Sequence, residues 1–207
     1  MARANGTRVD GLLSFVRKHM ENFKQYDRIT RMSTILRRYF VMNAFDGALT
    51  IFGILIGSYV ADVTDPVLIV KVGLAAAVAV GISGFSGAFF TEQAERKREL
   101  QEIEHALHRK LDKTHLQKAY YFASVITAVV DGFSPFIAAL FILLPFFFYP
   151  LLESMQTAYY VSFGFSIVSF FLLGMFLGKV SRESMLATGA KLVLVGIACM
   201  LIILALT

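Results

Sequence analysis

Five long apolar runs follow one another along the chain, separated by short polar segments. An α-helix needs about 20 predominantly apolar residues to cross the hydrocarbon core of a bilayer. The runs occupy residues 39–61, 66–90, 119–149, 158–178 and 186–207. The pattern predicts an all-α polytopic membrane protein with five transmembrane helices.

The composition agrees with this fold class. Of the 207 residues 57% are hydrophobic and 17% are charged, whereas soluble domains carry about 25% charged residues. The single cysteine, Cys199, lies inside the last apolar run. A disulfide framework and a thiolate zinc site are therefore excluded.

The basic residues predict the orientation in the membrane. Most of them precede the first run or lie between the second and third runs, and the loops 62–65 and 150–157 contain no Lys or Arg. Cytoplasmic loops are the ones enriched in Lys and Arg. We therefore expect a multi-pass protein of the cell membrane, with the N-terminus in the cytoplasm and the C-terminus outside. The net charge of +5 then reflects topology, and no nucleic-acid partner is expected.

Four segments follow from this topology. Residues 1–38 form a cytoplasmic or interfacial segment, 39–90 the first two transmembrane helices, 91–118 a cytoplasmic Glu/His-rich segment, and 119–207 the last three transmembrane helices. The apolar stripe from Val9 to Phe23 indicates an amphipathic helix in the membrane interface, or one docked on the protein's own loops. The basic, polar lead before residue 39 is unlike a cleavable signal peptide.

The cytoplasmic segment carries two sets of potential metal ligands at helical spacing. The first set is Glu92, Glu95, Glu99 and Glu102. The second set, on an adjacent face, is His105, His108, Asp112 and His115. No Gly or Pro interrupts residues 91–114, so the second transmembrane helix is expected to continue into the cytoplasm. Thr114 and Gln117 resemble a capping box, which would begin a new helix and place His115 on it.

Two interpretations of this segment stay open. One is a solvated helix with ion pairs one turn apart, such as Glu92–Arg96 and Arg98–Glu102. The other is a carboxylate and imidazole collector for divalent cations, which includes His105 and suits Mn, Fe or Zn. Two such helices facing each other in a dimer would supply more ligands than one.

Two acidic residues lie within the apolar runs, Asp46 in the first and Asp131 in the third. An ionisable group at that depth costs about 3 kcal/mol and indicates a functional site. The alternatives are a buried protonated carboxyl or a pair with Lys71. Polar or soft side chains at similar depth extend the candidate transport pathway. The full set is Asp46, Met42, Asn43, Thr50, Ser83 and Asp131.

Pairs of small residues four apart favour close helix contacts. They are Gly53 with Gly57, Ser83 with Gly87, and Gly174 with Gly178. A homodimer joined through the first helix would bring two copies of Asp46 towards a shared axis. Pro135 is expected to bend the third helix beside Asp131.

Five sequence features, in order, cover about residues 37–207. They are Asp46-Gly47, Ile82-Ser83 with Gly87, the glutamates from Glu92, Ala139-Leu140 with Leu144-Pro145, and Gly189 with Leu194-Val195-Gly196. In these features the chain resembles the vacuolar iron transporter (CCC1-like) family, in the short form of archaea and bacteria. The resemblance implies a homodimer of five-span protomers that moves Fe²⁺ or Mn²⁺ out of the cytoplasm, against protons.

The resemblance also implies roles for particular residues. Asp46 would lie in the translocation path, and the glutamates at 92, 95, 99 and 102 would bind metal. Better-known members carry a pathway methionine after Ile-Ser in the second span, where this chain has Gly84. The cytoplasmic insertion is also much shorter than in plant members.

Three functions are therefore compared. The first is a proton-coupled exporter of Fe²⁺ or Mn²⁺, in which the ion is the substrate and no cofactor is needed. The second is a membrane sensor or scaffold that binds metal without transporting it, and the third is transport of another solute on the same fold. An enzyme is not expected, because the sequence lacks a nucleophile with its base, a phosphate-binding glycine loop and an HExxH-type site.

Overall fold

The structure is a computed structural model that describes residues 26–28, 30–111, 114–152 and 154–206. Within these residues it consists of helices and contains no strand. The elements are α2 (Met32–Val60), α3 (Pro66–Leu107), α4 (His115–Phe147), the short η1 (Tyr149–Leu151), α5 (Met155–Ser181) and α6 (Met185–Leu206). The five long helices are each long and apolar enough to cross a membrane. The predicted five-span, all-α fold is confirmed, while the stripe from Val9 to Phe23 and Asp112 lie outside the described residues.

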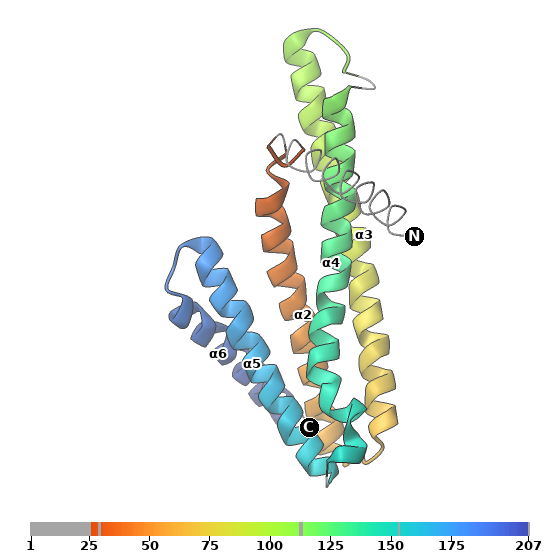
Figure 1. Cartoon of the computed structure of the whole chain (residues 1–207), viewed down its shortest axis with the longest axis vertical. Helices are drawn as coiled ribbons and strands as arrows, with labels where there is room; N and C mark the ends of the chain where they lie inside the picture. The colour runs from red at the N-terminus through yellow and green to blue at the C-terminus, as the bar shows by residue number, and fades with distance from the viewer. Residues whose placement is uncertain (1–25, 29, 112–113, 153, 207) are drawn as a thin grey trace, which may run out of the picture.

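The helices form two hairpins on either side of α2. In Figure 1, α3 and α4 run side by side for most of their length, and their connected ends extend beyond the other helices. The hairpin of α5 and α6 leans away from α3 and α4 at that end. The connections α2–α3 and α4–α5 lie at the opposite end of the molecule.

The second transmembrane helix continues past its apolar run, as the sequence predicts. α3 has 42 residues, which corresponds to about 63 Å of helix against a hydrocarbon core of about 30 Å. It ends at His108, whose φ of 48° is left-handed. The side chain of Thr114 then caps α4 by accepting a hydrogen bond from the Gln117 amide. The histidines therefore do not share one helix, because His115 opens α4.

Glycines set the distances between the helices. A Cβ at Gly47 would lie 2.5 Å from the Cα of Pro135, so α2 and α4 are in backbone contact there. α3 and α4 approach equally closely at Gly81 and Gly132, where a Cβ on Gly81 would lie 2.6 Å from the Gly132 carbonyl oxygen. α4 continues as one helix through Pro135.

The glycine pairs named above have different surroundings. Gly174 and Gly178 both pack against α6, so this pair joins helices within the chain. A Cβ at Gly53 would lie 3.5 Å from Ile203 of α6, whereas a Cβ at Gly57 or Gly87 would meet no atom of the described residues within 4 Å. Gly57 and Gly87 therefore stand on open faces of α2 and α3.

Candidate functional site

A polar pair lies in the middle of the bundle, between α2 and α4. The amide nitrogen of Asn43 donates a hydrogen bond to Oδ1 of Asp131. Asp131 is only 3% exposed, and the described residues place no Lys, Arg or His in a salt bridge with it. An ionised carboxylate without a cationic partner is costly at this depth, and the hydrogen bond from a neutral amide offsets only part of that cost.

Three oxygen atoms converge beside this pair at Gly84 of α3. A Cβ on Gly84 would lie 3.1 Å from Oδ2 of Asp131, 3.5 Å from Oδ1 of Asn43 and 3.5 Å from the Asp131 carbonyl oxygen. Within α4 that carbonyl would accept a hydrogen bond from the amide of residue 135, but proline has no N–H. Asp131 therefore presents two oxygens to one small space that only glycine leaves open.

Asp46 lies one turn beyond Asn43 on α2, and its side chain is on the outside of the single chain. It is near enough to Asp131 for the two carboxyl groups to influence each other electrostatically. The alternative pairing with Lys71 is not seen, because no salt bridge among the described residues joins Lys71 to either acid. Met42, also on the outside of α2, is 57% exposed.

The other predicted pathway residues do not join this cluster by hydrogen bonds. The hydroxyl of Thr50 donates to the carbonyl of Asp46, 2.8 Å away within the same helix. Ser83 lies on the exposed surface of α3. Asn43 and Asp131 are therefore the predicted residues that the fold brings into direct contact, with Asp46 beside them.

The glutamates on the extension of α3 face in different directions. Glu92 is 2% exposed and lies 3.6 Å from the Nε of Arg96, which also contacts Glu99 at 3.1 Å. Arg96 donates to the Thr30 carbonyl as well and lies 5.3 Å from the centre of the Tyr120 ring. Arg96 thus joins α3, α4 and the segment before α2, and it neutralises two of the four glutamates that were predicted to bind metal.

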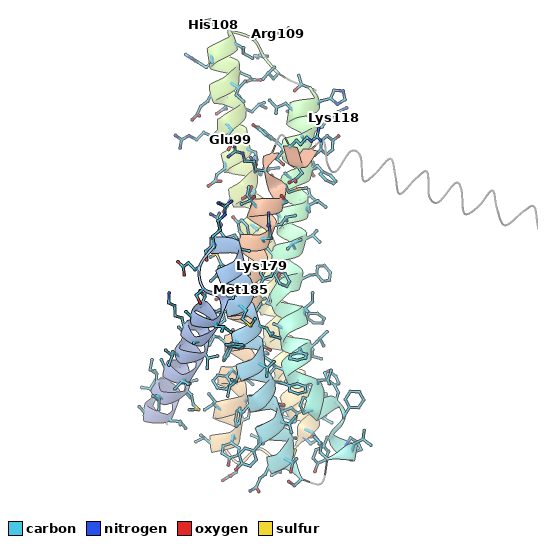
Figure 2. The ribbon with its side chains drawn as sticks, turned by 60° about the vertical axis from the view of Figure 1, so that its left-hand side comes forward. Glu99, His108, Arg109, Lys118, Lys179 and Met185 are labelled. Carbon is cyan, nitrogen blue, oxygen red and sulfur yellow. The ribbon has the colours of Figure 1, made fainter. Side chains whose placement is uncertain are left out.

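The remaining predicted ligands lie on the surface. Glu102 pairs with Arg98 at 3.0 Å, and Glu95 and His105 are exposed. Figure 2 shows Glu99 midway along the extension, with His108 and Arg109 at its tip. Within the part of the chain that the structure describes, no three Asp, Glu, His or Cys side chains come together as metal ligands.

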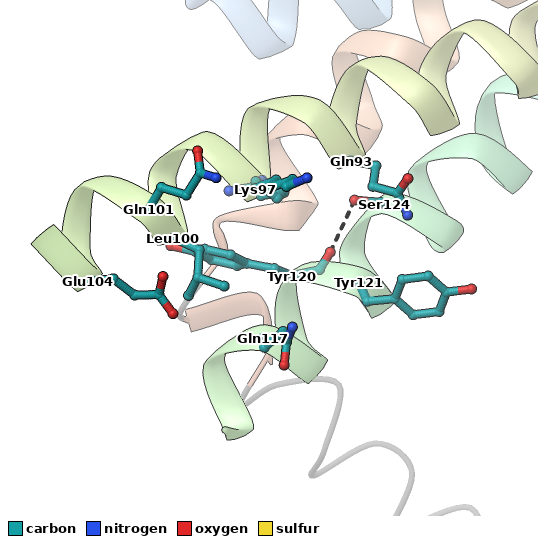
Figure 3. A pocket seen from close by; sticks show the side chains of 10 residues that line it. Gln93, Lys97, Leu100, Gln101, Glu104, Gln117, Tyr120, Tyr121 and Ser124 are labelled. Carbon is teal, nitrogen blue, oxygen red and sulfur yellow. Dashed lines mark hydrogen bonds between the residues drawn. The ribbon is translucent and has the colours of Figure 1, made fainter. Parts of the chain in front are cut away.

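A cavity of about 450 Å³ opens between the extension of α3 and the first turns of α4. Figure 3 shows Lys97, Gln101 and Glu104 on one wall and Tyr120 and Ser124 on the other. Charged and amide side chains line it together with Leu100 and two tyrosines, and we refer to it as the α3–α4 pocket.

Two features of the site were not predicted from the sequence. One is the role of Arg96 in joining three segments. The only hint of it in the sequence was that Arg96 lies four residues after Glu92, a spacing that allows an ion pair on a helix. The other is the contact of Asn43 with Asp131. Their similar depth in two apolar runs was the signal there, but depth alone does not show that two side chains face each other.

Comparison with known proteins places this geometry in a family. The model of the VIT family matches residues 37–120 and 104–207. An uncharacterized protein of Methanocaldococcus jannaschii is 34% identical over 159 residues, which are 75% of this chain and 80% of that protein. No solved structure matches. With most of its length covered and its five spans in place, the chain belongs to the VIT (vacuolar iron transporter) family, which indicates a multi-span membrane protein that transports metal ions.

Proposed function

We propose that the protein exports Fe²⁺ or Mn²⁺ from the cytoplasm in exchange for protons, as a homodimer joined through α2. The observation that carries the proposal is the position of Asp46. It lies within a membrane span, on the outside of the single chain, without a salt-bridge partner among the described residues.

An acidic side chain facing lipid at this depth would cost several kcal/mol. A second copy packed on the same face of α2 would remove Asp46 from the lipid and bring the two carboxyl groups together. Gly57 supports this packing, since its open side allows close approach of another helix.

The chemistry of this face suits a transition-metal ion. Two carboxylates facing each other repel, and a divalent cation between them relieves the repulsion. The Met42 thioether, one turn from Asp46 on the same exposed face, adds a soft ligand, which favours Fe²⁺ over Mg²⁺ or Ca²⁺. Protons compete with the metal for the same carboxylate oxygens, so binding of one releases the other.

The exposed groups on the extension of α3 would gather cations before they enter. Glu95, Glu102 and His105 point to solvent, and a partner chain would double their number. In Figure 2 Lys118 lies near this extension, and Lys179 lies about half-way along the molecule, at the end of α5 that is nearer to the extension. By the positive-inside rule that end is cytoplasmic, which supports uptake of the ion from the cytoplasm, an external C-terminus and a place in the cell membrane.

Metal flux into sealed proteoliposomes, with a pH-sensitive dye inside, tests the proposal. Asp46→Asn keeps the side-chain volume but removes the negative charge, and it is expected to abolish flux of Fe²⁺ and Mn²⁺ while the dimer stays intact. Asp62→Asn is the matched control, because Asp62 lies in the α2–α3 loop with φ 52°, a conformation that asparagine tolerates. Wild-type flux from Asp46→Asn would refute the role of Asp46.

The same assay separates the other functions. Binding of metal by the wild-type protein without flux would support a sensor or scaffold. Flux of Zn²⁺ or Ca²⁺ that Fe²⁺ and Mn²⁺ do not compete with would support transport of another solute.

A further inference from the structure

A row of buried polar side chains runs along α4 towards Asp131. Its members recur at i, i+4, i+7, i+11 and i+14, so they share one face of the helix. They are Tyr120, Ser124, Thr127, Asp131 and Ser134, and each is less than a tenth exposed. We call this row the α4 polar stripe.

One end of the stripe opens into the α3–α4 pocket. Tyr120 and Ser124 line that pocket, and the dashed line in Figure 3 marks the hydrogen bond from the Ser124 hydroxyl to the Tyr120 carbonyl. At 1.5 Å per residue, Asp131 lies about 10 Å further along the helix than Ser124. The stripe therefore leads from the α3–α4 pocket to the acid in the middle of the bundle.

Close packing of small residues accounts for part of the stripe. Ser124 and Ser134 each donate to the carbonyl one turn earlier, which is common for serine in membrane helices. Thr127 differs, because its hydroxyl is buried and has no hydrogen-bond partner among the described residues. A buried hydroxyl without a partner is unfavourable. A water molecule beside Thr127 would pair it and would stand between Ser124 and Asp131.

The space at Gly84 also favours a proton over a metal ion. Its three oxygens lie 3.1–3.5 Å from the position of a single Cβ atom, and two of them belong to one residue. Only one of the three is a carboxylate oxygen, so they compensate little of the charge of a divalent cation. A proton on Oδ2 of Asp131 needs little space. It converts one of these three hydrogen-bond acceptors into a donor.

We propose that Asp131 is a second proton-binding residue, separate from the cation site at Asp46, and that it exchanges its proton with the cytoplasm along the α4 polar stripe. This inference rests on the proposed metal–proton exchange and adds its stoichiometry. When a divalent cation arrives between the two Asp46 side chains of the dimer, the O–H bonds of both Asp46 and both Asp131 residues break and four protons leave. Asp46 is the titratable group of the described residues that acts electrostatically on Asp131. Two positive charges then leave the cytoplasm for every four that enter, so each cycle moves net charge.

The test uses the full-length protein in proteoliposomes whose membrane potential is set by a potassium gradient and valinomycin. In the wild type we expect the rate of net Mn²⁺ transport to change several-fold with the potential. In Asp131→Asn the two Asp131 protons are lost from the cycle, so two charges move in each direction and transport is insensitive to the potential. Exchange of radioactive for unlabelled Mn²⁺, which needs no proton movement, is expected to continue in this variant.

Thr127→Val and Thr127→Ser test the stripe without touching either acid. Valine has nearly the shape of threonine but no hydroxyl, so proton-coupled transport is expected to slow several-fold while Mn²⁺–Mn²⁺ exchange does not. Serine restores the hydroxyl and the rate. This pair tests the inference even where Asp131→Asn fails to fold.

Each contrary outcome has a distinct meaning. A wild-type protein whose transport is insensitive to the potential overturns the inference. Asp131→Asn that stays sensitive to the potential, or that loses Mn²⁺–Mn²⁺ exchange together with net transport, also overturns it. So does equal transport by the valine and serine variants of Thr127. A wild-type protein that exchanges Mn²⁺ without moving protons overturns the coupling but leaves metal transport standing. A wild-type protein without Mn²⁺ exchange overturns the proposed function itself.

Discussion

Substitution of Gly47 by alanine tests the contact that fixes α2 against α4. The added Cβ would lie 2.5 Å from both Cα and Cβ of Pro135 and 2.7 Å from its carbonyl oxygen. These atoms belong to the backbone or to a rigid ring, so no flexible side chain can move aside. The two helices must separate instead.

The size of the effect follows from these distances. Carbon atoms in contact prefer about 3.5–4.0 Å, so α2 and α4 must move apart by about 1 Å. Overpacking of this kind costs about 1–3 kcal/mol, and the better helix propensity of alanine returns up to about 1 kcal/mol. We expect a net loss of about 1–2 kcal/mol in the free energy of unfolding.

Gly164→Ala is the matched control. Gly164 lies inside α5, and a Cβ there would meet no atom within 4 Å, so this change is expected to be neutral or slightly stabilising. Thermal unfolding of both variants in the same detergent, followed by circular dichroism, gives the comparison. If Gly47→Ala unfolds at or above the temperature of Gly164→Ala, the close contact of α2 with α4 is refuted.

Two further predictions concern stability. Arg96→Ala leaves the buried carboxylate of Glu92 without its ion pair and is expected to lower the free energy of unfolding by about 3–5 kcal/mol. Arg98→Ala breaks an exposed pair and should change that free energy by less than about 1 kcal/mol. Equal unfolding temperatures for the two variants would contradict this prediction. Tyr159→Phe removes a 2.9 Å hydrogen bond to the Val63 carbonyl and should cost about 1 kcal/mol, measured as a lower unfolding temperature; no change would show that this bond does not stabilise the α2–α3 loop.

The features that depend on local chain chemistry were predictable from the sequence. The apolar runs located all five spans because backbone groups in lipid must be satisfied within a helix. The lack of Gly and Pro after Phe90 predicted the long extension of α3, and Thr114 predicted the start of α4. The helix bounds differ from the apolar runs, since α2 already begins at Met32. Charged residues such as Arg37 and Arg38 are good helix formers.

The features that depend on helix register were not predictable. Asn43 and Asp131 are 88 residues apart, and their contact requires α2 to be docked on α4 at the depth set by Gly47 and Pro135. A shift of one residue would rotate Asn43 away from Asp131 by about 100°. The same argument applies to the four glutamates, whose common stripe did not reveal that Glu92 faces inward.

The unbroken length of α3 has a mechanical consequence. Gly81, where α3 touches the α4 backbone most closely, divides the helix into an arm of about 22 Å on one side and about 39 Å on the other. A tilt about Gly81 would displace the end of α3 at Leu107 further than the end at Pro66. Gly84 lies only one turn from Gly81. A large displacement of the Leu107 end would therefore reach the oxygens of Asn43 and Asp131 only as a small displacement of Gly84.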